Sequence, residues 1–188
     1  QLACTRSPQP WRFILSGRTL GEPPQLTALG PSMRDAVVRP DAPVLIDQEG
    51  GRVRLIKPPI LQAYPNARIL GEIYERDREE GLRAAWLMSR LHAFDLMKFG
   101  INVDCLPVLD VPVEGASNVI GNRAYGYSPT MVAQMGQAAP ACLTAGCISP
   151  VTKHMPRHCP GYVVSLYRFP PVLAPLRELL PPNFVSLP

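Results

Sequence analysis

The feature that most limits the fold of this chain is an alternation of short apolar runs with segments of helical periodicity. The apolar runs read as buried strands and cover residues 11–15, 43–46, 101–109 and 147–152. The segments with helical spacing lie between or after these runs, at residues 25–38, 74–99 and 129 to about 143. Such alternation predicts an α/β fold with a parallel sheet.

The segment 74–99 has the clearest helical pattern. Its start is acidic, Lys98 lies near its end, and Gly100 follows as a stop signal. The mostly apolar face expected to pack inward contains Leu82, Trp86, Ser89, Ala93 and Leu96. We therefore assign Trp86 to the helix core.

Prolines and one histidine complete the expectations for the helices. Gly30-Pro31 is expected to break the first helix and Pro140 to interrupt the last, since proline removes a helical donor. His92, inside the long helix, is interpreted as a packing or surface residue.

Charged residues follow most of the expected strands. In parallel α/β folds, polar residues just past the carboxyl ends of the strands build the active site. Those positions hold Arg18, Asp47, Asp110, Lys153 and His154. We therefore predict a cluster that brings Asp47 and Lys153 together at one end of the sheet.

Composition excludes several functional classes. Hydrophobic residues make up 46% of the chain and charged residues 18%, which is globular composition. The net charge is only +4, and the sequence contains no basic run interleaved with aromatic residues, so we expect no nucleic-acid partner. No apolar stretch reaches the roughly 18 residues of a membrane span, so we expect no membrane partner.

The cysteines and the start of the chain predict the compartment and the cofactors. The five cysteines show neither CxxC spacing nor an accompanying His pair, so we expect no metal site and no cofactor. Free thiols suit a reducing compartment, and the first residues lack the apolar run of a signal peptide. These features favour a cytoplasmic location.

The most informative stretch is Asp47-Gln48-Glu49-Gly50-Gly51-Arg52-Val53. A strand ends in a carboxylate, two glycines allow a tight turn, and an arginine follows. Taken alone, the stretch also fits a polar turn with a surface salt bridge. A site for a phosphorylated ligand at Gly50, Gly51 and Arg52 is a further reading, although no GxGxxG or P-loop pattern is present.

Together with three later motifs, this stretch resembles the signature of family 3 glycoside hydrolases, in particular the bacterial β-N-acetylglucosaminidases. The later motifs are at residues 107–111, 119–126 and 153–156, and their order and spacing agree with the family. The resemblance covers about residues 10–185. It implies a (β/α)8 barrel, a retaining mechanism, and a substrate with a terminal N-acetylglucosamine linked to N-acetylmuramic acid.

The resemblance also assigns roles to single residues. It implies that the substrate is bound by Asp47, Arg52, Arg123, Lys153 and His154. Charged hydrogen bonds to sugar hydroxyls suit these side chains. Asp110 is interpreted as structural, since its motif places it at a strand end that orients the loop toward Arg123. A salt bridge beneath the site is the alternative role for Arg123.

The chain departs from the family in the loop at residues 157–166. The positions of the family's proton-transfer Asp and His hold Val164 and Leu166, neither of which can move a proton. His158 is the one substitute on this loop, and the nucleophile is expected beyond Pro188. Eight prolines from Pro156 to Pro188 predict a poorly ordered tail over residues 156–188.

We therefore expect one α/β domain over residues 1–188, a partial (β/α)8 barrel of roughly the first four β/α units. The family activity is hydrolysis of terminal N-acetyl-β-glucosamine from peptidoglycan fragments, with an N-acetylglucosamine-containing saccharide as the partner. This chain is expected to be catalytically incomplete. The alternative is a sugar-binding or regulatory module of the same fold that does not catalyse hydrolysis.

The loop sequence generates the first testable prediction. The chain should not measurably hydrolyse a chromogenic N-acetyl-β-glucosaminide, because a positioned proton-transfer group contributes about 10²–10⁴-fold to such a rate. A variant with Val164→Asp and Leu166→His, joined to the downstream half of a homologous barrel, is the comparison. Turnover by the unmodified chain that disappears in His158→Ala would contradict the prediction.

Overall fold

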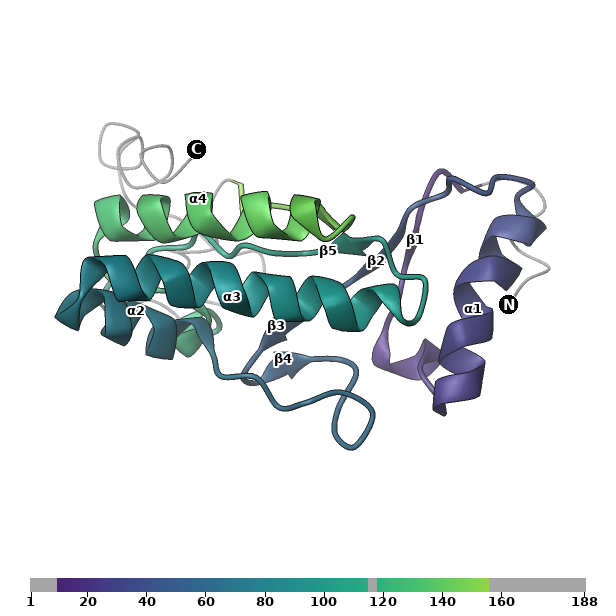
Figure 1. Ribbon diagram of the computed structural model, residues 1–188, viewed down its shortest axis with the longest axis horizontal. Helices are drawn as coiled ribbons and strands as arrows, with labels where there is room; N and C mark the ends of the chain where they lie inside the picture. The colour runs from purple at the N-terminus through teal and green to yellow at the C-terminus, as the bar shows by residue number, and fades with distance from the viewer. Residues whose placement is uncertain (1–9, 115–117, 156–188) are drawn as a thin grey trace.

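The structure, a computed structural model, describes residues 10–114 and 118–155 (Figure 1). Its larger sheet has four parallel strands in the order β1-β2-β5-β6. These strands are β1 (Phe13–Ile14), β2 (Val44–Ile46), β5 (Val103–Asp104) and β6 (Ser149–Pro150). The expected α/β fold with a parallel sheet is confirmed.

Among the described residues, four α-helices accompany the sheet: α1 (Pro23–Ala36), α2 (Ala67–Arg76), α3 (Arg78–Met97) and α4 (Pro129–Ala145). Figure 1 shows α3 lying alongside both α2 and α4, with α1 apart from them near β1. Short 3-10 turns lie at Gly17–Thr19 (η2) and Gly121–Arg123 (η3). Within the described ranges, no helix is both long and apolar enough to cross a membrane.

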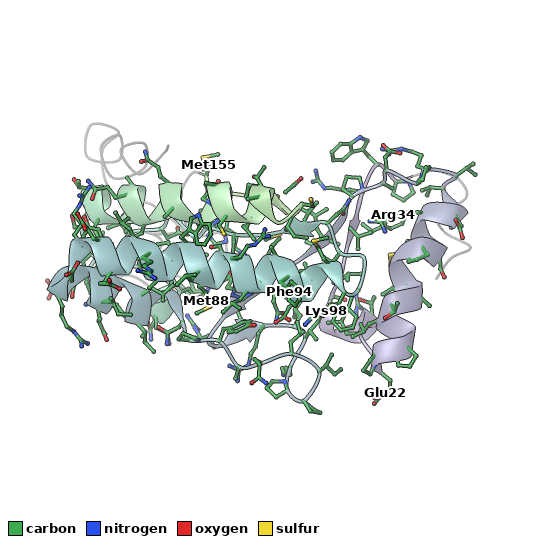
Figure 2. All side chains as sticks on the ribbon, in the orientation of Figure 1. Glu22, Arg34, Met88, Phe94, Lys98 and Met155 are labelled. Atoms are coloured by element: carbon green, nitrogen blue, oxygen red, sulfur yellow. The ribbon has the colours of Figure 1, made fainter. Side chains whose placement is uncertain are left out.

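The α1 helix is tied to the sheet by one of its own side chains. Arg34 donates to the carbonyl oxygens of Ala42, at 3.1 Å, and Gly100, at 3.0 Å. Figure 2 labels Arg34 on the side of α1 that faces the rest of the molecule. The carbonyls belong to the segments that lead into β2 and β5, so this side chain joins the start of the sheet to its first helix.

The strands are shorter than the apolar runs that predict them. Of residues 101–109, only Val103–Asp104 belong to β5, and Val108 adds a separate bridge to Lys153. Pro107 interrupts the run, because proline lacks the N–H that a continued ladder needs. The bridge nevertheless brings Lys153 beside the end of this run.

The helix expected at residues 74–99 is two helices that meet at Asp77. Asp77 has an extended backbone, and its side chain caps α3 by accepting the N–H groups of Glu79 at 2.9 Å and Glu80 at 3.1 Å. A carboxylate at an N-cap satisfies donors that a continuous helix would pair with carbonyls. The single-helix prediction was therefore wrong at this position, and it missed the start of α2 after Asn66.

The two prolines expected to break helices do not do so. Pro31 lies inside a continuous α1, and Pro140 lies inside a continuous α4. Next to Pro140, the side chains of Ala139, Cys142 and Leu143 are fully buried. Tertiary packing of this kind supplies most of the stability of a protein helix and outweighs one lost hydrogen bond.

The buried face of α3 is made largely of small residues and does not include Trp86. Ala85, Ser89, Ala93 and Leu96 are buried, whereas Trp86 is 43% exposed, so its assignment to the core was wrong. The close approach of α2 and α4 explains this, since small side chains let helices pack tightly. His92 is buried at 1% exposure. Its ring packs edge-on against the ring of Tyr64, with the two ring centroids 5.0 Å apart, which confirms a packing role.

The cap at Asp77 yields a prediction about stability. Asp77→Ala should lower the free energy of unfolding by about 1 kcal/mol, because the first turn of α3 loses its acceptor. Urea denaturation of the full chain measures the change. Arg83→Ala, an exposed change within the same helix, is the control and should have a much smaller effect. Equal effects of the two variants would contradict the capping role.

Candidate functional site

A tight hairpin follows β2 and carries the first functional side chains. Strands β3 (Gln48–Gly50) and β4 (Val53–Arg54) are antiparallel, with Gly50 at φ 92° and Gly51 at φ 55°. A Cβ on Gly51 would lie 2.5 Å from Cβ of Asn66. Both the positive φ angles and this close approach require glycine. The predicted glycine turn after Asp47 is confirmed.

Gln48 holds the hairpin against the following loop from inside the protein. It is 1% exposed, and its side-chain oxygen accepts the N–H groups of Leu55 and Ile56 at 3.0 Å each. Its amide nitrogen donates to the carbonyl of Ile56 at 2.9 Å. Because all three bonds reach the next segment, the side chains on either side of Gln48 are held in place.

An ionic cluster lies at the carboxyl ends of the strands. Lys153 contacts the carboxylate of Asp47 and lies 2.6 Å from that of Glu49. Arg123 donates two parallel hydrogen bonds to Glu49, at 2.9 and 2.8 Å. We call Asp47, Glu49, Arg123 and Lys153 the strand-end cluster. The predicted meeting of Asp47 and Lys153 is confirmed.

Most of the strand-end cluster is withdrawn from solvent. Side-chain exposure is 5% for Glu49, 12% for Lys153 and 13% for Arg123, but 36% for Asp47. Asp47 is therefore the member most open to a ligand. The other three form the ionic base that holds it.

The electrostatics keep both cations charged. Burial alone would lower the pKa of Lys153, but the charge of Glu49 and the contact with Asp47 outweigh it and raise that pKa. Burial also opposes the charge of Arg123, and its hydrogen bonds to Glu49 again raise the pKa. Opposite charges at these distances favour the ionised forms.

His154 is oriented by a buried carboxylate. Its Nδ1 lies 2.6 Å from Oδ2 of Asp110, and its backbone N–H donates to the same oxygen at 3.3 Å. Asp110 is fully buried, at 0% exposure. The sequence predicts a structural role for Asp110 in orienting a loop toward Arg123. In the structure Asp110 orients the ring of His154, the residue after Lys153.

Arg52, another predicted binding residue, lies apart from the strand-end cluster. It is exposed, and its Nη2 donates to the carbonyls of Asn118, Val119 and Ile120 at 3.0, 2.6 and 3.0 Å. The carbonyl of Val119 also accepts from Arg123, at 3.3 Å. Arg52 thus meets the cluster only through this shared loop, and it also lines a pocket of about 400 Å³ with Asn122 and Tyr127.

Glu49 is a central residue of the site that was not predicted from the sequence. The signal that could have found it is its position two residues after Asp47, because alternate residues of an extended segment point to the same side. The loop positions of Val164, Leu166 and His158 lie outside the described residues. In residues 10–114 and 118–155, no group of three His, Cys, Asp or Glu side chains is placed to hold a metal ion.

The fold and the site define a class: a parallel α/β protein with charged side chains gathered where the strands end. The sequence matches the family model described as the glycosyl hydrolase family 3 N terminal domain over residues 13–184. The chain therefore belongs to glycoside hydrolase family 3.

Known proteins agree with this membership. The chain is 34% identical over 158 residues to a beta-hexosaminidase of Bordetella avium, covering 84% of this chain and 44% of that protein. It resembles native NagZ from Neisseria gonorrhoeae with a TM-score of 0.86 and 29% identity, covering 95% of this chain and 52% of that one. The same NagZ in complex with N-trifluoroacetyl-D-glucosamine has a TM-score of 0.85, at 29% identity, over 95% of this chain and 51% of that one. The chain thus spans about half the length of these relatives.

The strand-end cluster generates a stability prediction. Glu49→Gln should lower the free energy of unfolding by about 3–5 kcal/mol, because Arg123 and Lys153 would remain buried after losing a shared anion. Urea denaturation measures the loss. Asp41→Asn is the matched control, since Asp41 pairs with Arg39 at the surface, at 72% exposure, and should leave stability nearly unchanged. A loss in Glu49→Gln no larger than in the control would refute the proposed importance of the cluster.

Proposed function

We propose that this chain binds a terminal N-acetylglucosamine unit at the strand-end cluster. One observation carries the proposal: a half-exposed carboxylate, Asp47, is held at the strand ends by a buried lysine. Ionised groups make shorter and stronger hydrogen bonds to hydroxyls than neutral groups do. A fixed carboxylate at the surface is therefore suited to accept hydrogen bonds from two hydroxyl groups of one sugar ring.

The neighbouring side chains suit the same ligand. His154 follows Lys153 directly, and its ring is oriented by Asp110, so it offers a second polar group next to Lys153 in the chain. Arg123 donates two parallel hydrogen bonds to Glu49 and so holds the base of the site. That a structural relative was studied with an N-acetylglucosamine analogue supports this class of ligand.

We further propose that the site belongs to a β-N-acetylhexosaminidase acting on peptidoglycan fragments in the cytoplasm, with these strands as the first four of an eight-stranded barrel. The beta-hexosaminidase relatives support the glycosidase assignment. Free cysteines in the described part of the chain, Cys105, Cys142 and Cys147, suit a reducing compartment. Val164 and Leu166 favour a second candidate, a module that binds the sugar without hydrolysing it.

Binding of N-acetylglucosamine to the full chain tests the proposal. In an NMR titration the chain should respond to the sugar, and Asp47→Asn should weaken binding about tenfold or more, since one charged hydrogen-bond acceptor is lost. Asp41→Asn, an exposed aspartate paired with Arg39 elsewhere on the surface, is the control and should bind like the parent chain.

Two results would count against the proposal. If the folded parent chain shows no response to N-acetylglucosamine, the sugar-binding assignment is wrong. If Asp47→Asn and Asp41→Asn bind as the parent does, the sugar binds elsewhere. Turnover of a chromogenic glycoside by the same preparation would separate the enzyme from the non-hydrolysing module.

A further inference from the structure

Asp104 takes no part in the ion pairs of the strand-end cluster, although it lies next to them. It is the last residue of β5, opposite Ile46 of β2, and it is 0% exposed. Its Oδ1 accepts the backbone N–H of Gln48 at 3.1 Å. Since Gln48 lies between Asp47 and Glu49, this bond holds the backbone that carries both cluster carboxylates.

The other oxygen of Asp104 is left without a partner. Among the described residues, Oδ2 is buried and makes no hydrogen bond. Among the same residues, Asp104 also forms no ion pair, because Lys153 contacts Asp47 and Glu49 instead. A buried carboxylate with a bare oxygen is costly if it carries a charge.

The charges of the cluster are already balanced without Asp104. Asp47 and Glu49 contribute two negative charges, while Lys153 and Arg123 contribute two positive ones. An ionised Asp104 would make a third negative charge, and in the described part of the chain no cation touches it. Cys105, the next residue in the chain, offers no positive charge. Burial and the charge of Asp47 raise the pKa of its thiol to about 11.

We infer that Asp104 is a positioning residue that works as a neutral carboxylic acid, fixing the Asp47–Glu49 turn through Gln48 while leaving Lys153 to those two carboxylates. The inference goes beyond the proposed sugar binding, because it concerns how the site is held. In the neutral form, Oδ1 still accepts the hydrogen bond from Gln48. The proton lies on Oδ2, so the buried carboxyl group has no charge.

The electrostatics agree with this geometry. Burial raises the pKa of Asp104 well above its ordinary value, and the charges of Asp47 and Glu49 raise it further. The Gln48 N–H and the charge of Lys153 act in the opposite direction but do not reverse the shift. The groups facing Asp104 therefore favour the protonated form.

Stability measured against pH tests this inference without any ligand. A carboxyl whose pKa is raised in the fold keeps a proton that the unfolded chain releases above its ordinary pKa of 3.8. The parent chain therefore loses stability as pH rises from that value toward the raised pKa, whereas Asp104→Asn does not titrate. The Tm of Asp104→Asn relative to the parent should rise by about 2–4 °C or more between about pH 4 and pH 7.

A matched variant isolates the effect. Asp95→Asn changes another buried aspartate, on α3, which is bound by Tyr64 and Lys98 and lies outside the cluster. Its Tm difference from the parent should not rise with pH. If the difference for Asp104→Asn is flat or falls as pH rises, Asp104 is charged in the fold and the inference is wrong.

Sugar affinity supplies a second readout that rests on the proposed function. Asp104→Asn, which keeps an acceptor for Gln48, should bind N-acetylglucosamine within about twofold of the parent, whereas Asp104→Ala should bind about tenfold more weakly. An Asn variant as weak as the Ala variant would overturn the neutral-acid role. If the parent itself does not bind the sugar, the proposed function fails, while the pH series still decides the state of Asp104, even where Asp104→Ala does not fold.

Discussion

The contact of Lys153 with Asp47 and Glu49 is the interaction on which the rest of the site depends. It joins the segment after β6 to the hairpin after β2, although 106 residues separate Lys153 from Asp47. Arg123 then closes the arrangement from the loop after β5 by binding Glu49. One buried ammonium group thus collects side chains from the ends of strands that are distant in the chain, as parallel α/β folds do at their functional edges.

The backbone around the cluster is built to keep it rigid. Gly50 and Gly51 allow the hairpin to turn at once after the carboxylates, and Gln48 anchors it by its side chain inside and by its N–H to Asp104. The bridge of Val108 to Lys153 fixes the far side. Because each charged side chain is held by a neighbour, the partly exposed Asp47 is presented to a ligand with little freedom to lose.

The sequence could predict the strand ends and one contact between them. Asp47 and Lys153 were expected to meet, since parallel strands bring their carboxyl ends to one edge, and the structure confirms this. Glu49 was missed although it lies two residues after Asp47 in an extended segment, and Asp104 was missed because nothing local marks a carboxylate that will accept a backbone N–H from the segment after the neighbouring strand. Arg52 was expected to bind the substrate, and in the structure three loop carbonyls hold it outside the strand-end cluster.

The helices show the same limit of periodicity. Spacing placed Trp86 on the inner face of α3, yet neighbouring helices approach closely enough that small side chains fill that face. Near the carboxyl end of this helix, Phe94 is 64% exposed and carries Lys98 over its ring at 4.7 Å (Figure 2). Asp77 shows that one capping side chain can divide a segment whose periodicity is continuous.

A crystal structure of the full chain with N-acetylglucosamine is the most direct measurement of whether the strand-end cluster is a sugar site. The expected result is a sugar ring whose hydroxyl groups lie within hydrogen-bond distance of the Asp47 carboxylate and beside His154. A sugar found instead in the pocket of about 400 Å³ lined by Arg52, Asn122 and Tyr127, with Asp47 untouched, would contradict it.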